Sequence, residues 1–288
     1  MHVALVIGAV AAVVSAVVGV FTVVRGQSFA GHALTDVATT GGSGAFVLNI
    51  SPLSGFLGAA IFGAGAMELV GVQRVRGRDL ATGVVLGAAT GLAALFLFLD
   101  TTRFATTGAT QTILFGSIFT VASSTIPTVA VFSAATIAVI AVIYRPLLLS
   151  SFSADLAAAR GISLRTVGLL FMLALAVSVG LSSIAIGSVL STALLIGPAA
   201  AALRVTRSLA GALALACGLG VATVWLGVLL AYDSFYWFPN SQGLPVSSFI
   251  VALIFAAYLL SGLPVLRRRG ERGRTAHGAR ELSRVGTA

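Results

Sequence analysis

The sequence predicts an all-α polytopic bundle of about eight or nine transmembrane helices, and three observations support this class. Hydrophobic residues make up 58% of the 288 residues and charged residues 9%, whereas a soluble domain carries about 25% charged residues. The mean hydropathy is +1.08. Apolar stretches of about 20 residues, long enough to cross a bilayer, recur along nearly the whole chain. We therefore expect one membrane domain over residues 1–266 and a basic, disordered tail over 267–288.

Nine apolar stretches are candidate spans. They cover residues 3–24, 28–49, 54–73, 80–99, 126–144, 164–182, 186–203, 208–231 and 246–266. The first stretch lacks a basic segment before it, so we expect a retained span and not a signal peptide. Residues 101–125 are rich in Thr, Ser and Gly. This segment predicts a surface helix or a re-entrant piece and is not counted as a span.

The positive charge predicts the orientation of these spans. The net charge of +9 comes from arginine alone, because the chain has no lysine. Arginines follow spans one, three, five, seven and nine, and only Arg103 lies at the other side. Since positive loops stay in the cytoplasm, we expect a cell-membrane protein with its N-terminus outside and its C-terminus in the cytoplasm. The same placement accounts for the charge without a nucleic-acid partner.

The chain lacks the motifs by which a protein hydrolyses ATP or catalyses another reaction by itself. A Walker A motif needs lysine, and neither a His-Glu-x-x-His nor a Gly-x-Ser-x-Gly pattern occurs. The single cysteine, Cys217, can form no intrachain disulfide and no Cys-rich metal site. We therefore expect no enzyme activity and no permanently bound cofactor. Active transport would draw on an ion gradient or on a separate ATPase.

Three ionisable residues lie inside predicted spans: His32, Asp36 and Glu68. His32 and Asp36 are one helical turn apart and share a helix face. His32 is about 10 Å beyond Arg25, and Glu68 is about 9 Å before Arg74, at 1.5 Å per residue. Imidazole and carboxylate ligands suit zinc, manganese or iron, so these residues are candidates for a metal pathway. The alternative is structural pairing, of His32 with Asp36 and of Glu68 with an arginine.

Other features are expected to be structural. Asp100 and Asp233 lie at outer span ends and are expected in solvent. Gly83, Gly87 and Gly91 are spaced by four residues, which is typical of close helix packing. Residues 49–52, Asn-Ile-Ser-Pro, predict a tight turn.

A short helix is expected in the loop between spans five and six. Ser153 is a plausible N-cap, Asp155 falls in the first turn, and Gly161 follows Arg160 as a C-terminal stop. A cytoplasmic helix over 153–160 is a candidate contact for an ATPase. The alternative is an ordinary connector.

Three segments, in this order, resemble the integral permeases of ABC importers for metal ions. The first is Arg25 to Asp36, similar to the family's Gly-[Asp/His]-Ala-[Leu/Ile] stretch that ends in His or Asp. The second is residues 151–161, Ser-Phe-Ser-Ala-Asp-Leu-Ala with Gly161, similar to Ser-Phe-Asp-Pro-Glu-x-Ala-x-x-x-Gly. The third is residues 193–201, Ala-Leu-Leu-Ile-Gly-Pro-Ala-Ala-Ala, similar to Leu-Leu-Val-Ile-Pro-Ala-Ala.

The resemblance implies an all-helical type II importer permease for zinc, manganese or iron. It also implies a permease dimer in the lipid bilayer, cytoplasmic ATP-binding subunits and an extracytoplasmic metal-binding protein. The metal pathway would map to His32 and Asp36, with Glu68 nearby, and the coupling helix to residues 153–160. The ligand order here is His then Asp, whereas Asp then His is commoner in the family. The metal therefore stays open, as do two other readings: a permease for metal chelates such as siderophores or cobalamin, and a secondary transporter.

Overall fold

The computed structural model describes residues 2–70, 78–104, 108–116, 118–119, 121–237 and 244–262. Within these ranges all regular structure is helical, which confirms the predicted all-α class. The long helices are α1 (His2–Val24), α2 (Ser28–Val47), α3 (Pro52–Val70), α4 (Arg78–Leu99), α6 (Ile126–Phe152), α8 (Leu164–Ile186), α9 (Ser188–Val205), α10 (Leu209–Asp233) and a final helix over Val246–Gly262. The short ones are the π-helix η1 (Asp100–Phe104), α5 (Ala109–Phe115), the 3-10 turns η2 (Ser123–Thr125) and η3 (Ser234–Tyr236), and α7 (Ala154–Ala159).

Each predicted span corresponds to one of these long helices. Six candidate spans, built on α1, α4, α6, α8, α9 and α10, are long and apolar enough to cross a membrane by length and composition. One boundary was wrong: α6 continues past residue 144, through Pro146, to Phe152. Leu147 just after the proline is fully buried in the core, and this packing keeps the segment helical. The boundary between membrane domain and tail at residue 266 lies outside the described ranges.

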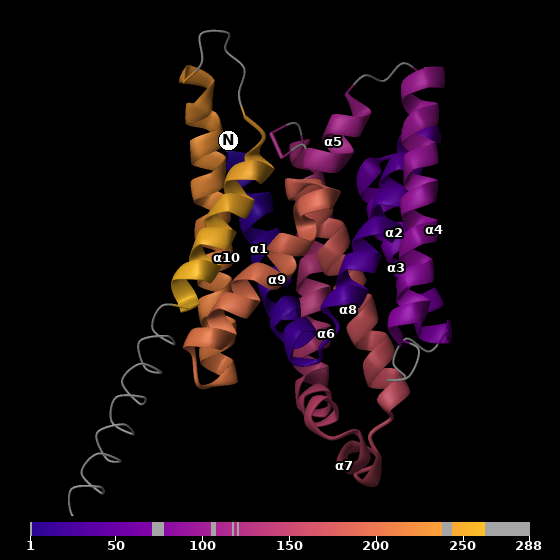
Figure 1. Cartoon of the computed structure of the whole chain (residues 1–288), viewed down its shortest axis with the longest axis vertical. Coiled ribbons are helices and arrows are strands. Elements are labelled where there is room, and N and C mark those ends of the chain that lie inside the picture. The colour runs from indigo at the N-terminus through magenta and orange to yellow at the C-terminus, as the bar shows by residue number, and fades with distance from the viewer. Residues whose placement is uncertain are drawn as a thin grey trace, which may run out of the picture.

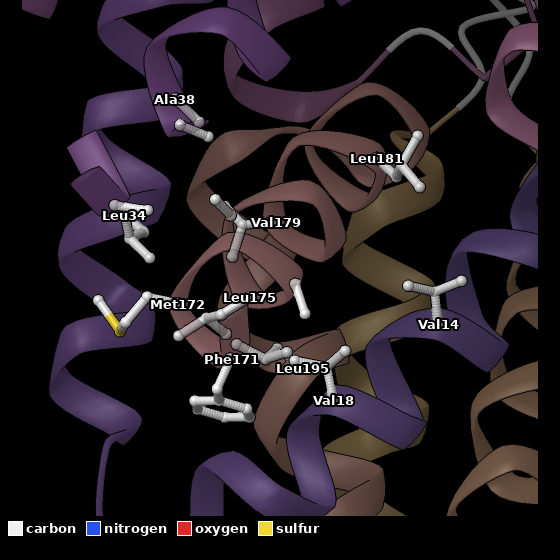
Figure 2. Packing of buried hydrophobic residues seen from close by; sticks show 14 of the residues in the cluster. Val14, Val18, Leu34, Ala38, Phe171, Met172, Leu175, Val179, Leu181 and Leu195 are labelled. Atoms are coloured by element: carbon white, nitrogen blue, oxygen red, sulfur yellow. The ribbon is translucent and has the colours of Figure 1, made fainter. Parts of the chain in front are cut away.

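The core of the bundle is built around α8. This helix packs against α1, α2, α3, α6 and α9. Figure 2 shows Phe171, Met172, Leu175, Val179 and Leu181 of α8 among side chains of its neighbours. Leu34 and Ala38 of α2, and Leu195 of α9, belong to the same buried cluster. The inner faces of α2 and α9 are therefore fixed by apolar packing, which leaves their other faces to carry polar side chains.

The two ends of the bundle differ in charge. The N-terminus and α5 lie at one end, called here the α5 end, and α7 lies at the opposite end, called the α7 end (Figure 1). The arginines whose side chains the structure describes all lie toward the α7 end, in the helix ends and connecting segments there. They are Arg25, Arg145, Arg160, Arg165, Arg204 and Arg207. Arg25 donates to Ser150 Oγ at 3.0 Å, which ties the α1–α2 turn to the end of α6.

The segment between α4 and α6 does not cross the bundle. Its helix α5 has seven residues and ends at Gly116, which lies against Gly187 in the turn between α8 and α9. Both glycines have φ of +83°, a conformation that favours glycine. A Cβ on either one would overlap backbone atoms of the other segment. The expectation that residues 101–125 contain no additional span agrees with this placement.

Close helix packing occurs at glycines other than the predicted ones. A Cβ on Gly41 of α2 or Gly55 of α3 would overlap the carbonyl oxygen of the other residue, so the two backbones meet there. In contrast, a Cβ on Gly83, Gly87 or Gly91 of α4 would meet no described heavy atom within 4 Å. The predicted role of these three glycines was wrong, because their spacing does not reveal which face of α4 packs within the chain. The predicted turn at 49–52 is confirmed: α2 ends at Val47, Asn49 has φ of +55°, and Pro52 begins α3.

Candidate functional site

Helix α2 carries a row of hydroxyl side chains through the bundle. Thr35 Oγ1 donates to Gly31 O at 3.0 Å, Thr39 Oγ1 to Thr35 O at 2.8 Å, and Ser43 Oγ to Thr39 O at 2.8 Å. All three residues are buried. Each hydroxyl uses a backbone carbonyl one turn earlier as its acceptor, so the helix can bury polar groups at small cost.

His32 lies on α2 beside α9. Its ring is exposed, and its Nδ1 lies 3.3 Å from Thr192 Oγ1 of α9. Thr192 Oγ1 in turn lies 3.2 Å from Thr35 Oγ1. The hydrogen-bond partner of His32 therefore comes from a helix 160 positions along the chain, and none of the hydrogen bonds among the described residues involves Nε2.

Asp36 lies one turn further along α2 and faces α4. Thr90 Oγ1 of α4 donates to Asp36 Oδ2 at 2.7 Å, and Thr40 Oγ1 donates to the Ala89 carbonyl at 2.7 Å. These two bonds fix α4 beside this part of α2. His32 and Asp36 are thus held by hydroxyls of different helices. The alternative that they bond each other finds no support among the hydrogen bonds of the described residues.

Glu68 lies on α3, which runs antiparallel to α2. A Cβ on Gly63 would touch Val37, one on Gly41 would touch Ala59, and one on Gly55 would touch Ala45. Continuing this register places Glu68 level with His32, as the sequence predicted. Glu68 is half-buried, and its Oε2 atom is buried with no hydrogen-bond partner in the described structure. The alternative partner Arg74 lies outside the described residues.

The three candidate residues do not form a ready-made metal cage. Among the residues described, no group of three or more His, Cys, Asp or Glu side chains is placed to hold a metal ion. What the structure provides is a His and a carboxylate one turn apart on α2, with a second carboxylate level with the His on α3. Such sparse ligands can bind a divalent cation weakly and exchange it. The role of His32, Asp36 and Glu68 in a metal pathway stays a prediction.

Thr90, Thr192 and Thr35 were missed by reasoning from the sequence. Their hydroxyls hold the candidate ligands in place. Threonine is common in these spans, and nothing in its spacing marks these three. The only signal available was the polar character of residues 35–43 on α2.

The predicted loop helix is confirmed as α7. Ser153 is its N-cap, since the Leu156 amide donates to Ser153 Oγ at 3.2 Å. Asp155 lies in the first turn, Arg160 is the C-cap, and Gly161 has φ of +74°. Of the six helix residues only Ala157 is buried. The helix therefore presents nearly all of its surface outward at the α7 end of the bundle (Figure 1).

Comparison with known proteins places this bundle in a family. Residues 1–262 match the ABC 3 transport family. The chain is 28% identical over 261 residues to the manganese transport system membrane protein MntC of Listeria innocua, which covers 90% of this chain and 89% of that protein. It is 30% identical over 226 residues to MntC of Halalkalibacterium halodurans, covering 77% of this chain and 75% of the other.

A solved structure agrees with these sequence matches. A chain of PsaBC from Streptococcus pneumoniae in complex with Fab superposes with a TM-score of 0.76 and 25% sequence identity, over 91% of this chain and 90% of that one. The fold, the order of the helices and the family match therefore agree with the resemblance seen in the three sequence segments. The chain belongs to the ABC 3 transport family, as a multi-pass integral membrane component.

Proposed function

We propose that this chain is the permease subunit of an ATP-driven importer for divalent transition-metal ions, with manganese as the first candidate and zinc and iron(II) as competitors. The observation that carries the proposal is the placement of His32 and Asp36. They lie one turn apart on a polar helix, each oriented by a neighbouring hydroxyl. The names of the two MntC relatives favour manganese among the metals that such ligands accept.

Metal uptake tests this proposal. Substituting His32 or Asp36 by Ala should lower manganese accumulation at least about tenfold, because a metal site loses a direct ligand. Accumulation is measured by elemental analysis of cells that depend on this transporter, with the membrane abundance of each variant determined alongside. His2→Ala and Asp233→Asn are matched controls, since both residues are exposed and away from α2. Normal uptake in both test variants would rule out the pathway.

The same assay separates the cargo classes. Free Mn²⁺, Zn²⁺ and Fe²⁺ should compete with one another for uptake, whereas an iron–siderophore complex or cobalamin should not. Competition by the chelate alone would favour the chelate reading. Uptake that persists without any ATPase would favour a secondary transporter.

The proposal includes a separate ATPase that contacts α7 at the cytoplasmic side. The apolar side chains of Phe152 and Leu156 support this contact, because Phe152 at the end of α6 is 78% exposed and Leu156 within α7 is 47% exposed. Exposed apolar side chains at a surface favour a protein partner. In this arrangement the α5 end faces outward, toward an extracytoplasmic metal-binding protein, and a second copy of the permease completes the pathway.

Copurification tests the α7 contact. The double variant Phe152→Ala, Leu156→Ala should retain about tenfold less ATPase on the purified permease, as expected when two anchoring side chains are removed. Val205→Ala is the control, because Val205 is 48% exposed at the same end but on α9. Equal amounts of ATPase on both variants would contradict the contact.

A further inference from the structure

A chain of three hydroxyl and imidazole contacts joins His32 to the backbone of α2. His32 Nδ1 lies 3.3 Å from Thr192 Oγ1, Thr192 Oγ1 lies 3.2 Å from Thr35 Oγ1, and Thr35 Oγ1 lies 3.0 Å from the Gly31 carbonyl oxygen. This row of contacts ends on the Gly31 carbonyl oxygen, which can only accept a hydrogen bond. That acceptor favours one donor–acceptor direction for the other two contacts.

Each hydroxyl has a single proton to donate. Thr35 gives its proton to Gly31 O, so Thr35 Oγ1 is an acceptor toward Thr192. If Thr192 gave its proton to His32, two oxygen lone pairs would face each other at 3.2 Å. If Thr192 instead donates to Thr35, each contact has one donor and one acceptor. In that arrangement Thr192 Oγ1 accepts from His32, which donates through Nδ1–H.

Ser191 does not compete for this arrangement. Its Oγ lies 3.4 Å from Thr35 Oγ1 but 3.1 Å from Ser188 O, within its own helix. The shorter contact gives the Ser191 proton a carbonyl acceptor. The acceptor position of Thr35 is thus left to Thr192, and Thr35 itself is buried at 1% exposure.

We infer that Thr192 is a positioning residue that holds His32 with its proton on Nδ1, so that the Nε2 lone pair is the one offered to the metal ion. The inference rests on the proposed function. In a metal-binding histidine, the hydrogen bond made by one ring nitrogen decides which nitrogen carries the proton and which one can bind the metal. Thr192 would supply that bond from α9, so the tautomer of the ligand depends on the packing of α9 against α2.

Histidine tautomers can be read directly by nitrogen NMR. The chain has three histidines, His2, His32 and His277, so the background His2→Gln, His277→Gln leaves His32 as the only source of signal. With ¹⁵N-labelled histidine in the full-length permease, we expect the Nδ1–H pattern. Thr192→Val should abolish that preference, and Thr192→Ser should restore it. Thr136→Val is the control, because Thr136 Oγ1 donates to the carbonyl of Phe132 in its own helix.

Metal binding supplies the second readout. With Mn²⁺ alone as the probe, Thr192→Val should weaken the affinity of the purified permease about 10–100-fold, the usual effect of losing such a partner. Thr192→Ser should bind as the parent does. An unchanged tautomer in Thr192→Val would overturn the inference. So would a shifted tautomer with unchanged Mn²⁺ affinity, if His32→Ala loses that affinity. If His32→Ala keeps full affinity, the proposed function fails and the tautomer assignment stands on the NMR result.

Discussion

Asp100 and Asp233 occupy opposite environments at the α5 end of the bundle. Asp100 opens the π-helix after α4 and is 1% exposed, and neither carboxylate oxygen has a hydrogen-bond partner in the described structure. Asp233 is exposed and accepts from Trp237 Nε1 at 3.0 Å. A buried carboxylate without partners costs free energy unless a partner binds it. Within the described structure Asp100 is therefore a source of instability.

Replacing Asp100 by Asn should raise the free energy of unfolding by about 1 kcal/mol, because it removes a carboxyl group whose two oxygens are buried without hydrogen-bond partners in the described structure. Thermal unfolding of the purified protein in detergent would measure this, with Asp233→Asn as a control that leaves stability unchanged. A loss of stability in Asp100→Asn would show that the carboxylate has a bonding partner in the intact protein.

The sequence predicted the environment of Asp233 but not that of Asp100. Both residues follow an apolar run, and a position at a span end predicts contact with solvent. The π-helix changes the direction in which Asp100 points, and α5 packs beside it. The spacing of residues along the sequence indicates neither the wider turn of the π-helix nor the position of α5. The same limit applies to Thr192, which meets His32 from 160 positions away.

Between elements, the crossing of α2 and α3 depends on two glycines. Gly41 and Gly55 allow the backbones to meet, and this contact sets the register that brings Glu68 level with His32. A side chain at the crossing would force the two helices apart. That displacement would also move Glu68 relative to His32 at the candidate site. The row of glycines on α4 has no such contact within the chain.

Gly41→Ala should destabilise the protein by about 1–3 kcal/mol, the usual cost of overpacking. Gly87→Ala is the matched control, since its Cβ would meet open space and alanine is the better helix former. Thermal unfolding of both variants in detergent measures the difference. Equal stability would mean that α2 and α3 can separate without loss of packing.

For the whole molecule, charge asymmetry and helix order favour one orientation in the membrane, which stays a prediction. The described arginine side chains gather toward the α7 end, and α5 stays at the other end without adding a crossing. The spans could be predicted from the sequence because hydrocarbon thickness dictates apolar length. The surfaces that would contact partner proteins could not be predicted from the sequence, because they consist of ordinary exposed residues.

Cysteine labelling tests this orientation. In a Cys217→Ser background, Ser51→Cys at the α2–α3 turn should react with a membrane-impermeant maleimide in intact cells. Ala158→Cys on α7 should react only after the membrane is opened. Both positions are exposed, so access depends on the side of the membrane. Labelling of Ala158→Cys in intact cells would reverse the assigned topology.

The central position of α8 has a mechanical consequence. Only residues 160–163 separate α7 from α8, and α8 shares its buried cluster with α1, α2, α3, α6 and α9. A closely packed interior resists compression, so α8 cannot slide past α2 without repacking around Leu34 and Leu175. Force applied to α7 can therefore have two effects. The short link bends and absorbs the force, or α8 and the helices packed against it shift as one body and move His32 and Asp36 with them.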